Sequence, residues 1–366
     1  GTGTISDKTA TYDSNYTVET TGCSREQHTF IGWTTKSNGT DDGYSWTGWS
    51  GTWVYDNGQY GISNNNLVLY ASARSAGKIV EFKGKEYTIV ELTHDAFDNI
   101  DIALFSAGGS VSKEYCPIAA KKGAIVIDNS SAWRMDDDCA LIVPEINIED
   151  AYQKSNIIAN PNCSTIQSVL PLKPLQDKFG LKKVVYTTYQ SVSGSGQKGV
   201  DDLNRCKNGE KPEFYPYDIS NTCIPEIDSF LDDGYTKEEM KMVNETRKIL
   251  HLDNLLVSAT CIRVPVAACH GVMMQVELEN SFTLEEVKEA LKNYPGIILY
   301  DDPKNHIYPN SIVAKDQDNV YVGRIRKDLT CENGLLLYSV ADNIRKGAAA
   351  NAVQIAMALD IDKCKK

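Results

Sequence analysis

The clearest chemical signal in the sequence is a cysteine in the run Asn160-Pro161-Asn162-Cys163-Ser164-Thr165. A strand-like apolar stretch leads into the Pro-Asn turn, and a helical pattern begins at Ile166. We therefore expect Cys163 at a helix N-terminus, where the helix dipole and the free N–H groups favour a reactive thiolate. The same N–H groups can hold an oxyanion. A small, buried and inert side chain is the alternative for any single cysteine.

A second set of reactive side chains lies in the stretch that begins at Cys261 and ends at His270. A strand carries Arg263, and a bend near Pro265 brings His270 a few residues later. Arginine binds a carboxylate through two parallel hydrogen bonds, and histidine serves as an acid or base near neutral pH. Taken singly, Arg263 could equally be a surface arginine and His270 a core side chain.

A third candidate is a charged pair in a helix that starts with the capping box Thr236-x-x-Glu239. Glu238 and Lys241 are three residues apart and share one face of that helix. The pair can be an ordinary solvated ion pair. It can also present one charge of each sign to a zwitterionic substrate.

Composition narrows the classes of partner. The 366-residue chain has a formal net charge of -12 and no basic tract, which argues against nucleic acid and against an anionic membrane surface. We find no apolar run of membrane-spanning length and no secretory signal. The ten cysteines form no paired CxxC pattern, so we expect no metal site and a reducing, cytoplasmic location.

Residues 1–68 differ in composition from the rest of the chain. They hold four of the five tryptophans and many Gly, Thr, Ser, Asn and Tyr residues, with no helical periodicity. We expect a small all-β module with a core around Trp33 and Trp53 and few contacts with the remainder. The stretches GTGTISDKTATYDSNYTV, TFIGWTTKSNGT and LVLYA resemble the internalin-type B repeat of bacterial surface proteins.

From residue 69 onward, strand-like and helical patterns alternate, which predicts an α/β fold with a parallel sheet. After residue 163 the strands lengthen and capped amphipathic helices appear, as in a mixed α+β domain. We therefore predict a truncated Rossmann-type nucleotide-binding domain over residues 69–162, completed by a helix within 343–366. A catalytic and dimerisation domain follows over residues 163–342.

Residues 69 to about 360 resemble the aspartate-semialdehyde dehydrogenases. The resemblance rests on SARSAGK, DIALFSAG, IDNSSAWR, VPEIN, NPNCSTIQ, YQSVSGSG, EEMKM, CIRVPV and YVGRIRKD, which occur in that order. It implies that Cys163 attacks the aldehyde, that phosphate releases aspartyl phosphate from the resulting thioester, and that His270 is the acid and base. Asn162 would steady the oxyanion and Gln190 would orient substrate or water.

The resemblance also implies the binding residues. Arg263 and Glu238 would bind the carboxylate and amino groups of aspartate semialdehyde, and Arg134 and Lys241 would bind phosphate. It implies NADP as cofactor and a homodimer as the assembly. The residues that would meet NADP are Ser72, Arg74 and Ser75 at the 2′-phosphate, with Ser106, Gly108, Ser193, Gly194 and Asn343 along the rest of the cofactor.

One feature of the family is missing from the sequence. We find no GxxGxxG loop after a first strand, although Rossmann-type folds use that loop to bind the pyrophosphate. The β module stands in its place, so we expect weak NADP binding. Two interpretations remain open: a working oxidoreductase, or an inactive fusion whose only competent part is the surface-type β module.

Overall fold

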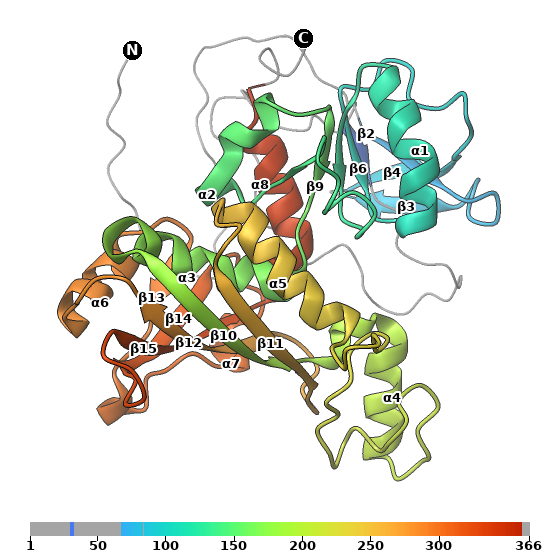
Figure 1. Cartoon of the computed structure of the whole chain (residues 1–366). Helices are drawn as coiled ribbons and strands as arrows, with labels where there is room; N and C mark the ends of the chain where they lie inside the picture. The colour runs from blue at the N-terminus through green and yellow to red at the C-terminus, as the bar shows by residue number, and fades with distance from the viewer. Residues whose placement is uncertain (1–29, 33–66, 83, 361–366) are drawn as a thin grey trace.

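The computed structural model describes residues 30–32, 67–82 and 84–360. The described residues form two units, each built around a sheet, and helix α3 (Cys163–Phe179) leads from the first unit into the second (Figure 1). No helix within these residues is long and apolar enough to cross a membrane.

The first unit contains a seven-stranded sheet in the order β5-β2-β1-β6-β7-β9-β8, and every strand pair in it is parallel. This is the doubly wound arrangement that the alternating pattern predicts. Its strands are β1 (Phe30–Gly32), β2 (Leu67–Ala71), β5 (Val90–Glu91), β6 (Ile102–Phe105), β7 (Ile125–Asp128), β8 (Ala140–Leu141) and β9 (Ile157–Ala159). A separate hairpin pairs β3 (Ile79–Phe82) with β4 (Lys85–Thr88).

Helices cover both faces of this sheet, which explains its continuous apolar strands. On strand β6, Ile102 and Leu104 belong to the cluster that contains residues of α8 (Ala350–Ala358). Ala103 and Phe105 belong to the opposite cluster, which contains residues of α1 (Gly109–Lys121). The C-terminal helix therefore completes the core of the first unit.

Strand β1 corrects one expectation. It lies between β2 and β6 and pairs in parallel with both, so residues from the N-terminal segment enter the centre of this sheet. The prediction that residues 1–68 form a separate β module with few contacts with the remainder is wrong for Phe30–Gly32. A three-residue strand is too short to show an apolar period in the sequence. The predicted core around Trp33 and Trp53 lies outside the described residues. So does most of the B-repeat resemblance, except for Phe30–Gly32 and LVLYA, which form β1 and β2.

The second unit contains a mixed six-stranded sheet in the order β11-β10-β12-β15-β14-β13. Helices α3, α5 (Lys237–Leu250) and α6 (Leu284–Lys292) lie on one side of it in Figure 1, and they bury a large apolar core against it. The strands are β10 (Leu181–Gln190), β11 (Leu256–Arg263), β12 (His270–Leu278), β13 (Ile297–Leu299), β14 (Val320–Lys327) and β15 (Gly334–Ala341).

The segments between these elements contain the helices α2 (Pro144–Asn147), α4 (Gln197–Lys207) and α7 (Ser311–Ala314). They also contain the 3-10 turns Ile148–Tyr152, Val192–Ser195 and Pro303–Asn305. Helix α5 begins at the predicted capping box of Thr236, and Thr283 forms a second full capping box at the start of α6. The helix predicted within residues 343–366 begins as a π-helix (Arg345–Ala349) and continues as α8.

Candidate active site

The site is built around the N-terminus of α3. Strand β9 ends at Ala159, and Cys163 is the first residue of the helix. The side chain of Asn162 caps this end, since its Oδ1 accepts hydrogen bonds from the N–H groups of Ser164 at 2.9 Å and Thr165 at 3.3 Å. The predicted helix start at the cysteine is therefore confirmed.

The expected resting thiolate is wrong. Burial, followed by the negative charge of Glu238, raises the pKa of Cys163 to about 11. Arg134 and Arg263 and the N–H of Ser164 act in the opposite direction but do not outweigh these two causes. The cysteine therefore rests as a thiol at neutral pH and has to lose its proton before it can attack a carbonyl.

Strand ends bring the other predicted residues to the cysteine. Gln190 and Arg263 are register partners at the ends of the parallel strands β10 and β11. Glu238 on α5 accepts hydrogen bonds at Oε1 from Nδ2 of Asn162 at 2.9 Å and from Nε2 of Gln190 at 3.1 Å. One carboxylate thus connects the residue before Cys163 to the end of strand β10.

Glu238 carries a negative charge at the centre of this group. Although burial alone would raise its pKa, the nearby ammonium of Lys241 and the hydrogen bonds from Asn162 and Gln190 hold the pKa of Glu238 below its usual value. The predicted pairing on one helix face is confirmed, because Nζ of Lys241 lies 3.1 Å from Oε2 of Glu238. Lys241 also bonds to Asp228 at 2.8 Å.

His270 begins β12 and is fully buried. Its backbone carbonyl accepts a hydrogen bond from Nε2 of Gln167, which lies one turn along α3 from Cys163. Its Nε2 is buried with no hydrogen-bond partner among the described residues. Burial, together with the positive charge of Arg263, lowers the pKa of His270 to about 3, so the ring is neutral at physiological pH.

Gly194 lies against both of these side chains. A Cβ added to it would lie 2.9 Å from NH1 of Arg263 and 3.1 Å from Nε2 of His270. These contacts, with those of Gln190, Glu238 and Gln167, bring the scattered predicted residues to the N-terminus of α3. A similar close approach occurs at Gly347 of the π-helix, whose added Cβ would lie 2.9 Å from Cβ of Cys163. Only a glycine fits at these two positions without displacing a site residue.

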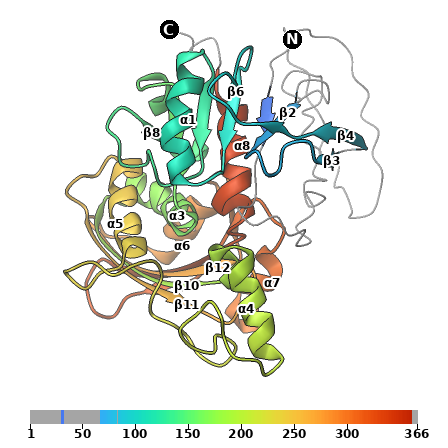
Figure 2. The same cartoon turned by 90° about the vertical axis from the view of Figure 1, so that its right-hand side faces the viewer.

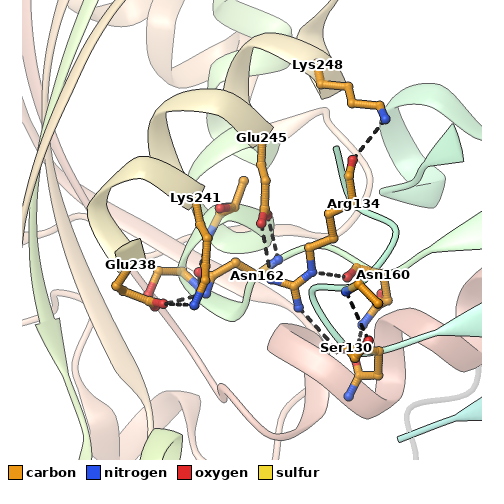
Figure 3. A network of polar contacts seen from close by, with 12 residues as sticks. Ser130, Arg134, Asn160, Asn162, Glu238, Lys241, Glu245 and Lys248 are labelled. Atoms are coloured by element: carbon orange, nitrogen blue, oxygen red, sulfur yellow. Dashed lines mark hydrogen bonds and ion pairs between the residues drawn. The ribbon is translucent and has the colours of Figure 1, made fainter. Parts of the chain in front are cut away.

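Figure 3 shows a second network beneath the helix N-terminus, and sequence reasoning missed its central residue. Glu245 is buried on α5 and accepts the backbone N–H of Asn162 at 2.7 Å through Oε2. Its Oε1 lies 3.1 Å from NH1 of Arg134. Glu245 follows Glu238 by two helical turns and therefore shares its face, which is the signal that would have found it.

Arg134 and Lys241, the predicted phosphate residues, line one pocket of about 210 Å³. Nε and NH2 of Arg134 also donate to the carbonyls of Asn160 at 2.9 Å and Asn129 at 3.1 Å, which fixes the guanidinium in place. The remaining lining residues are Ser131, Met135, Leu231, Lys237, Met240, Asn244 and Glu245.

The predicted cofactor residues fall into two groups. Ser72, Arg74 and Ser75 form the turn that follows β2, and Ser106 and Gly108 follow β6. Both turns lie at the carboxyl edge of the parallel sheet, where such folds bind nucleotides. Gly108 has a φ of 90° and precedes α1 without a side-chain cap, so that helix end keeps backbone N–H groups for an anion.

Ser193, Gly194 and Asn343 lie in the second unit instead. Oδ1 of Asn343 accepts hydrogen bonds from Ser193 Oγ at 3.2 Å and from the N–H of Cys269 at 3.0 Å. These bonds tie the loop after β10 to the residue before His270. No group of three or more His, Cys, Asp or Glu side chains suited to a metal ion occurs in residues 30–32, 67–82 and 84–360.

Comparison with known proteins decides the family. Residues 59–154 match the model of the semialdehyde dehydrogenase NAD binding domain, and residues 172–346 match the semialdehyde dehydrogenase dimerisation domain. The aspartate-semialdehyde dehydrogenase of Aquifex aeolicus is 56% identical over 302 residues, which cover 80% of this chain and 89% of that protein. The chain belongs to the aspartate-semialdehyde dehydrogenase family. It is an oxidoreductase with an NAD(P)-binding domain and a dimerisation domain.

Other aspartate-semialdehyde dehydrogenases agree. The Bacillus subtilis protein is 48% identical over 81% of this chain and 89% of its own length. The crystal structure of aspartate semialdehyde dehydrogenase II from Vibrio cholerae complexed with ASA is 44% identical, with a TM-score of 0.77 over 80% of this chain and 89% of that chain. The structure from Candida albicans with NADP is 26% identical, with a TM-score of 0.65 over 80% of this chain and 90% of that chain. Nothing in these comparisons supports an inactive fusion.

Proposed function

We propose that this chain converts L-aspartate 4-semialdehyde, phosphate and NADP into L-4-aspartyl phosphate and NADPH through a thioester on Cys163. The reaction belongs to the biosynthesis of lysine, diaminopimelate, threonine and methionine. The observation that carries the proposal is the arrangement at the N-terminus of α3, where Asn162 and Gln190 both donate hydrogen bonds to Glu238 beside the cysteine.

The substrate would lie between two charges of opposite sign. Arg263 is 4% exposed, and its Nε is buried without a partner among the described residues. A buried guanidinium with a free donor favours an anionic ligand, and the substrate carboxylate supplies one. Glu238 holds a negative charge that favours the substrate ammonium. The Vibrio cholerae relative in complex with ASA supports the same substrate.

The reaction begins when Cys163 gives up its proton and its sulfur bonds to the aldehyde carbon. His270 is neutral and can take that proton. The N–H groups at the start of α3 and the side chain of Asn162 would stabilise the oxyanion, and Gln190 would hold the substrate or the incoming nucleophile in line. A bound NADP would supply the hydride acceptor that converts this adduct into the thioester. Phosphate oxygen then attacks the thioester carbon, and the Cys163 sulfur leaves as a thiolate that regains its proton.

Arg134 and Lys241 would hold the attacking phosphate. Both line the same pocket, and both are cationic groups of the kind that bind phosphate oxygens. Their carboxylate partners, Glu245 and Glu238, keep the two cations in place between turnovers.

The cofactor would lie along the carboxyl edge of the parallel sheet. Arg74 is exposed in the turn after β2, and an arginine there can bind the 2′-phosphate that distinguishes NADP from NAD. Ser72 and Ser75 in the same turn add hydroxyl groups, and Ser106 and Gly108 would meet the next part of the cofactor. Gly194, Ser193 and Asn343 would lie at its nicotinamide end.

A homodimer is the assembly that we propose. The dimerisation-domain match covers the six-stranded sheet. Tyr189 and Leu256 alternate along their strands with core residues and therefore lie on the side of the sheet away from α3. Tyr189 on β10 is 41% exposed and Leu256 on β11 is 58% exposed, values that favour burial against a partner. A reducing, cytoplasmic location suits the free cysteines in the described residues.

Steady-state assays with the full chain test the function. We expect NADPH to form only when aspartate semialdehyde and phosphate are both present. Arg263→Lys should raise KM for the semialdehyde much more than it lowers kcat, because lysine lacks the planar fork of donors. No NADPH under these conditions, or an unchanged KM in Arg263→Lys, would contradict the proposal.

A further inference from the structure

Ser191 is a residue that none of the roles above uses, and it contacts His270 with two different groups. Its backbone N–H donates a hydrogen bond to Nδ1 of His270 at 3.0 Å. Its hydroxyl Oγ lies 3.1 Å from the same nitrogen. Both residues are completely buried, so water does not compete for these contacts.

The backbone contact fixes the hydrogen on the resting ring. A backbone N–H can only donate, so Nδ1 of neutral His270 must accept and the ring hydrogen must be on Nε2. A ring in this form has no lone pair on Nε2 and cannot take a proton there. Nε2 is nevertheless the nitrogen without a protein partner, and therefore the one available to the thiol and the substrate.

The hydroxyl of Ser191 can stabilise the other form of the ring, in which Nε2 is free to accept a proton. Before Nε2 can take up the proton of the thiol, its own hydrogen has to leave and Nδ1 has to gain one, so that the ring passes into its other neutral form. The hydrogen on Nδ1 then needs an acceptor. Of the two Ser191 groups at Nδ1, only Oγ can accept. Its own hydrogen can then point to Oδ1 of Asn343, which lies 3.1 Å from Oγ. His270 Nδ1 and Asn343 Oδ1 are thus both acceptors for the hydroxyl, at equal distances. Ser193 Oγ, at 3.0 Å, is a third partner and can donate to Ser191 Oγ or accept from it.

We propose that Ser191 is a positioning residue whose hydroxyl turns between His270 and Asn343 and thereby permits His270 to accept the proton of Cys163. The proposal rests on the proposed function of these two residues. The carbonyl of Ser191 also accepts a hydrogen bond from NH1 of Arg263 at 2.6 Å. The same residue therefore holds the proton acceptor and the group expected to bind the substrate carboxylate.

The surroundings of the ring contain one charged group that acts on it, Arg263 on β11. The other groups at the ring are uncharged: Ser191 after β10, Gly194 in the following turn, and the backbone of Cys269, whose hydrogen bond favours the protonated ring. Gln167 on α3 bonds to the backbone carbonyl of His270 and not to the ring. Arg263 disfavours the protonated ring in the unaltered chain and in a Ser191 variant alike. A difference between the two chains would consequently report on the hydroxyl.

The test compares Ser191→Ala with the matched control Ser339→Ala in the full chain. Ser339 is equally buried, on β15, and its hydroxyl has no partner among the described residues. We expect kcat to fall about tenfold to a hundredfold in Ser191→Ala with little change in KM, a smaller loss than the roughly 10²–10⁴-fold of a missing acid–base group. Ser339→Ala should keep the original kcat. Ser191→Thr, which keeps a hydroxyl, should recover part of the activity.

A spectroscopic measurement separates this proposal from the proposed function. Nitrogen NMR of the histidine rings, with His270→Asn to assign the signal, reports when Nδ1 becomes protonated. We expect His270 to gain this proton at a lower pH in Ser191→Ala than in the unaltered chain or in Ser339→Ala. An unchanged titration, or an unchanged kcat, would overturn the role of Ser191. Full activity in His270→Asn would instead overturn the proposed function, and the NMR result would still test the contact.

Discussion

Glu245 joins Arg134 to the residue that precedes the cysteine: its Oε2 accepts the N–H of Asn162 at 2.7 Å, and its Oε1 lies 3.1 Å from the guanidinium. Both side chains are buried. Removing one charge of a buried pair leaves the other uncompensated, which costs about 3–5 kcal/mol. The carboxylate is therefore expected to matter both for stability and for the position of the α3 N-terminus.

Glu245→Gln tests this directly. A side-chain amide keeps the shape but removes the charge, so we expect a loss of stability of about 3 kcal/mol and a lower kcat at saturating substrate. Urea unfolding and steady-state assays measure the two effects. Glu289→Gln, on the exposed side of α6, is the control and should change neither. Equal stability of the two variants would contradict the role given to Glu245.

The raised pKa of Cys163 predicts how its reactivity depends on pH. Because the thiol rests protonated, its alkylation by iodoacetamide should become about tenfold faster for each pH unit until the pH approaches about 11. Peptide mapping gives the rate at each cysteine, and the exposed Cys223 serves as an internal reference. Cys163→Ser should abolish both the label at this position and turnover. A rate at Cys163 that is already constant at pH 7 would show a resting thiolate instead.

Much of this site follows from the sequence, and the rest depends on contacts that no local pattern reports. The helix start at Cys163 and the capped helix that carries Glu238 are local features, and both are confirmed. Sequence reports neither the burial of the thiol nor its closeness to Glu238, and these two causes together raise the pKa of Cys163. Gly347 was missed for the same reason, since its contact with Cys163 joins positions far apart in the chain.

The strands of the two sheets also differ in how far the sequence predicts them. The long strands β10 and β12 carry enough apolar residues to be predicted. Strand β15 was missed, although its run GLLLYSVA is apolar, because an unbroken apolar run has no period of two. The three-residue β1 is defined by its parallel neighbours β2 and β6, and not by any pattern of its own.

The low pKa of His270 predicts that the folded chain loses stability in acid. Its pKa in the folded chain is about 3, below the value of about 6.5 for an unfolded histidine. Between these values the unfolded state binds a proton that the folded state does not, so stability should fall as the pH falls from about 6.5 toward about 3. Urea unfolding over this range should give a shallower pH dependence for His270→Asn than for the unaltered chain. Identical slopes would show that His270 is not buried as a neutral ring.

The missing GxxGxxG loop predicts weak cofactor binding. Charge-assisted hydrogen bonds contribute about 1.5–3 kcal/mol each, and the loop would supply two or three of them to the pyrophosphate. Since about 1.4 kcal/mol is a factor of ten, we expect NADP to bind several orders of magnitude more weakly than to a relative with the loop. Titration calorimetry on both proteins gives the comparison. Low-micromolar affinity in this chain would mean that another segment replaces the loop.

Arg74 should decide between the two forms of the cofactor. It is exposed in the turn after β2, beside Ser72 and Ser75, and its guanidinium can bind the 2′-phosphate that NAD lacks. We expect Arg74→Ala to weaken NADP binding by about tenfold to a hundredfold, the effect of one charge-assisted contact, and to leave NAD binding unchanged. Lys78→Ala is the matched control, because Lys78 is an exposed cation close by in the same connection. If both variants weaken NADP binding equally, the effect comes from the overall positive charge of this connection and not from a specific contact. If Arg74→Ala weakens NAD binding as much as NADP binding, the turn holds another part of the nucleotide.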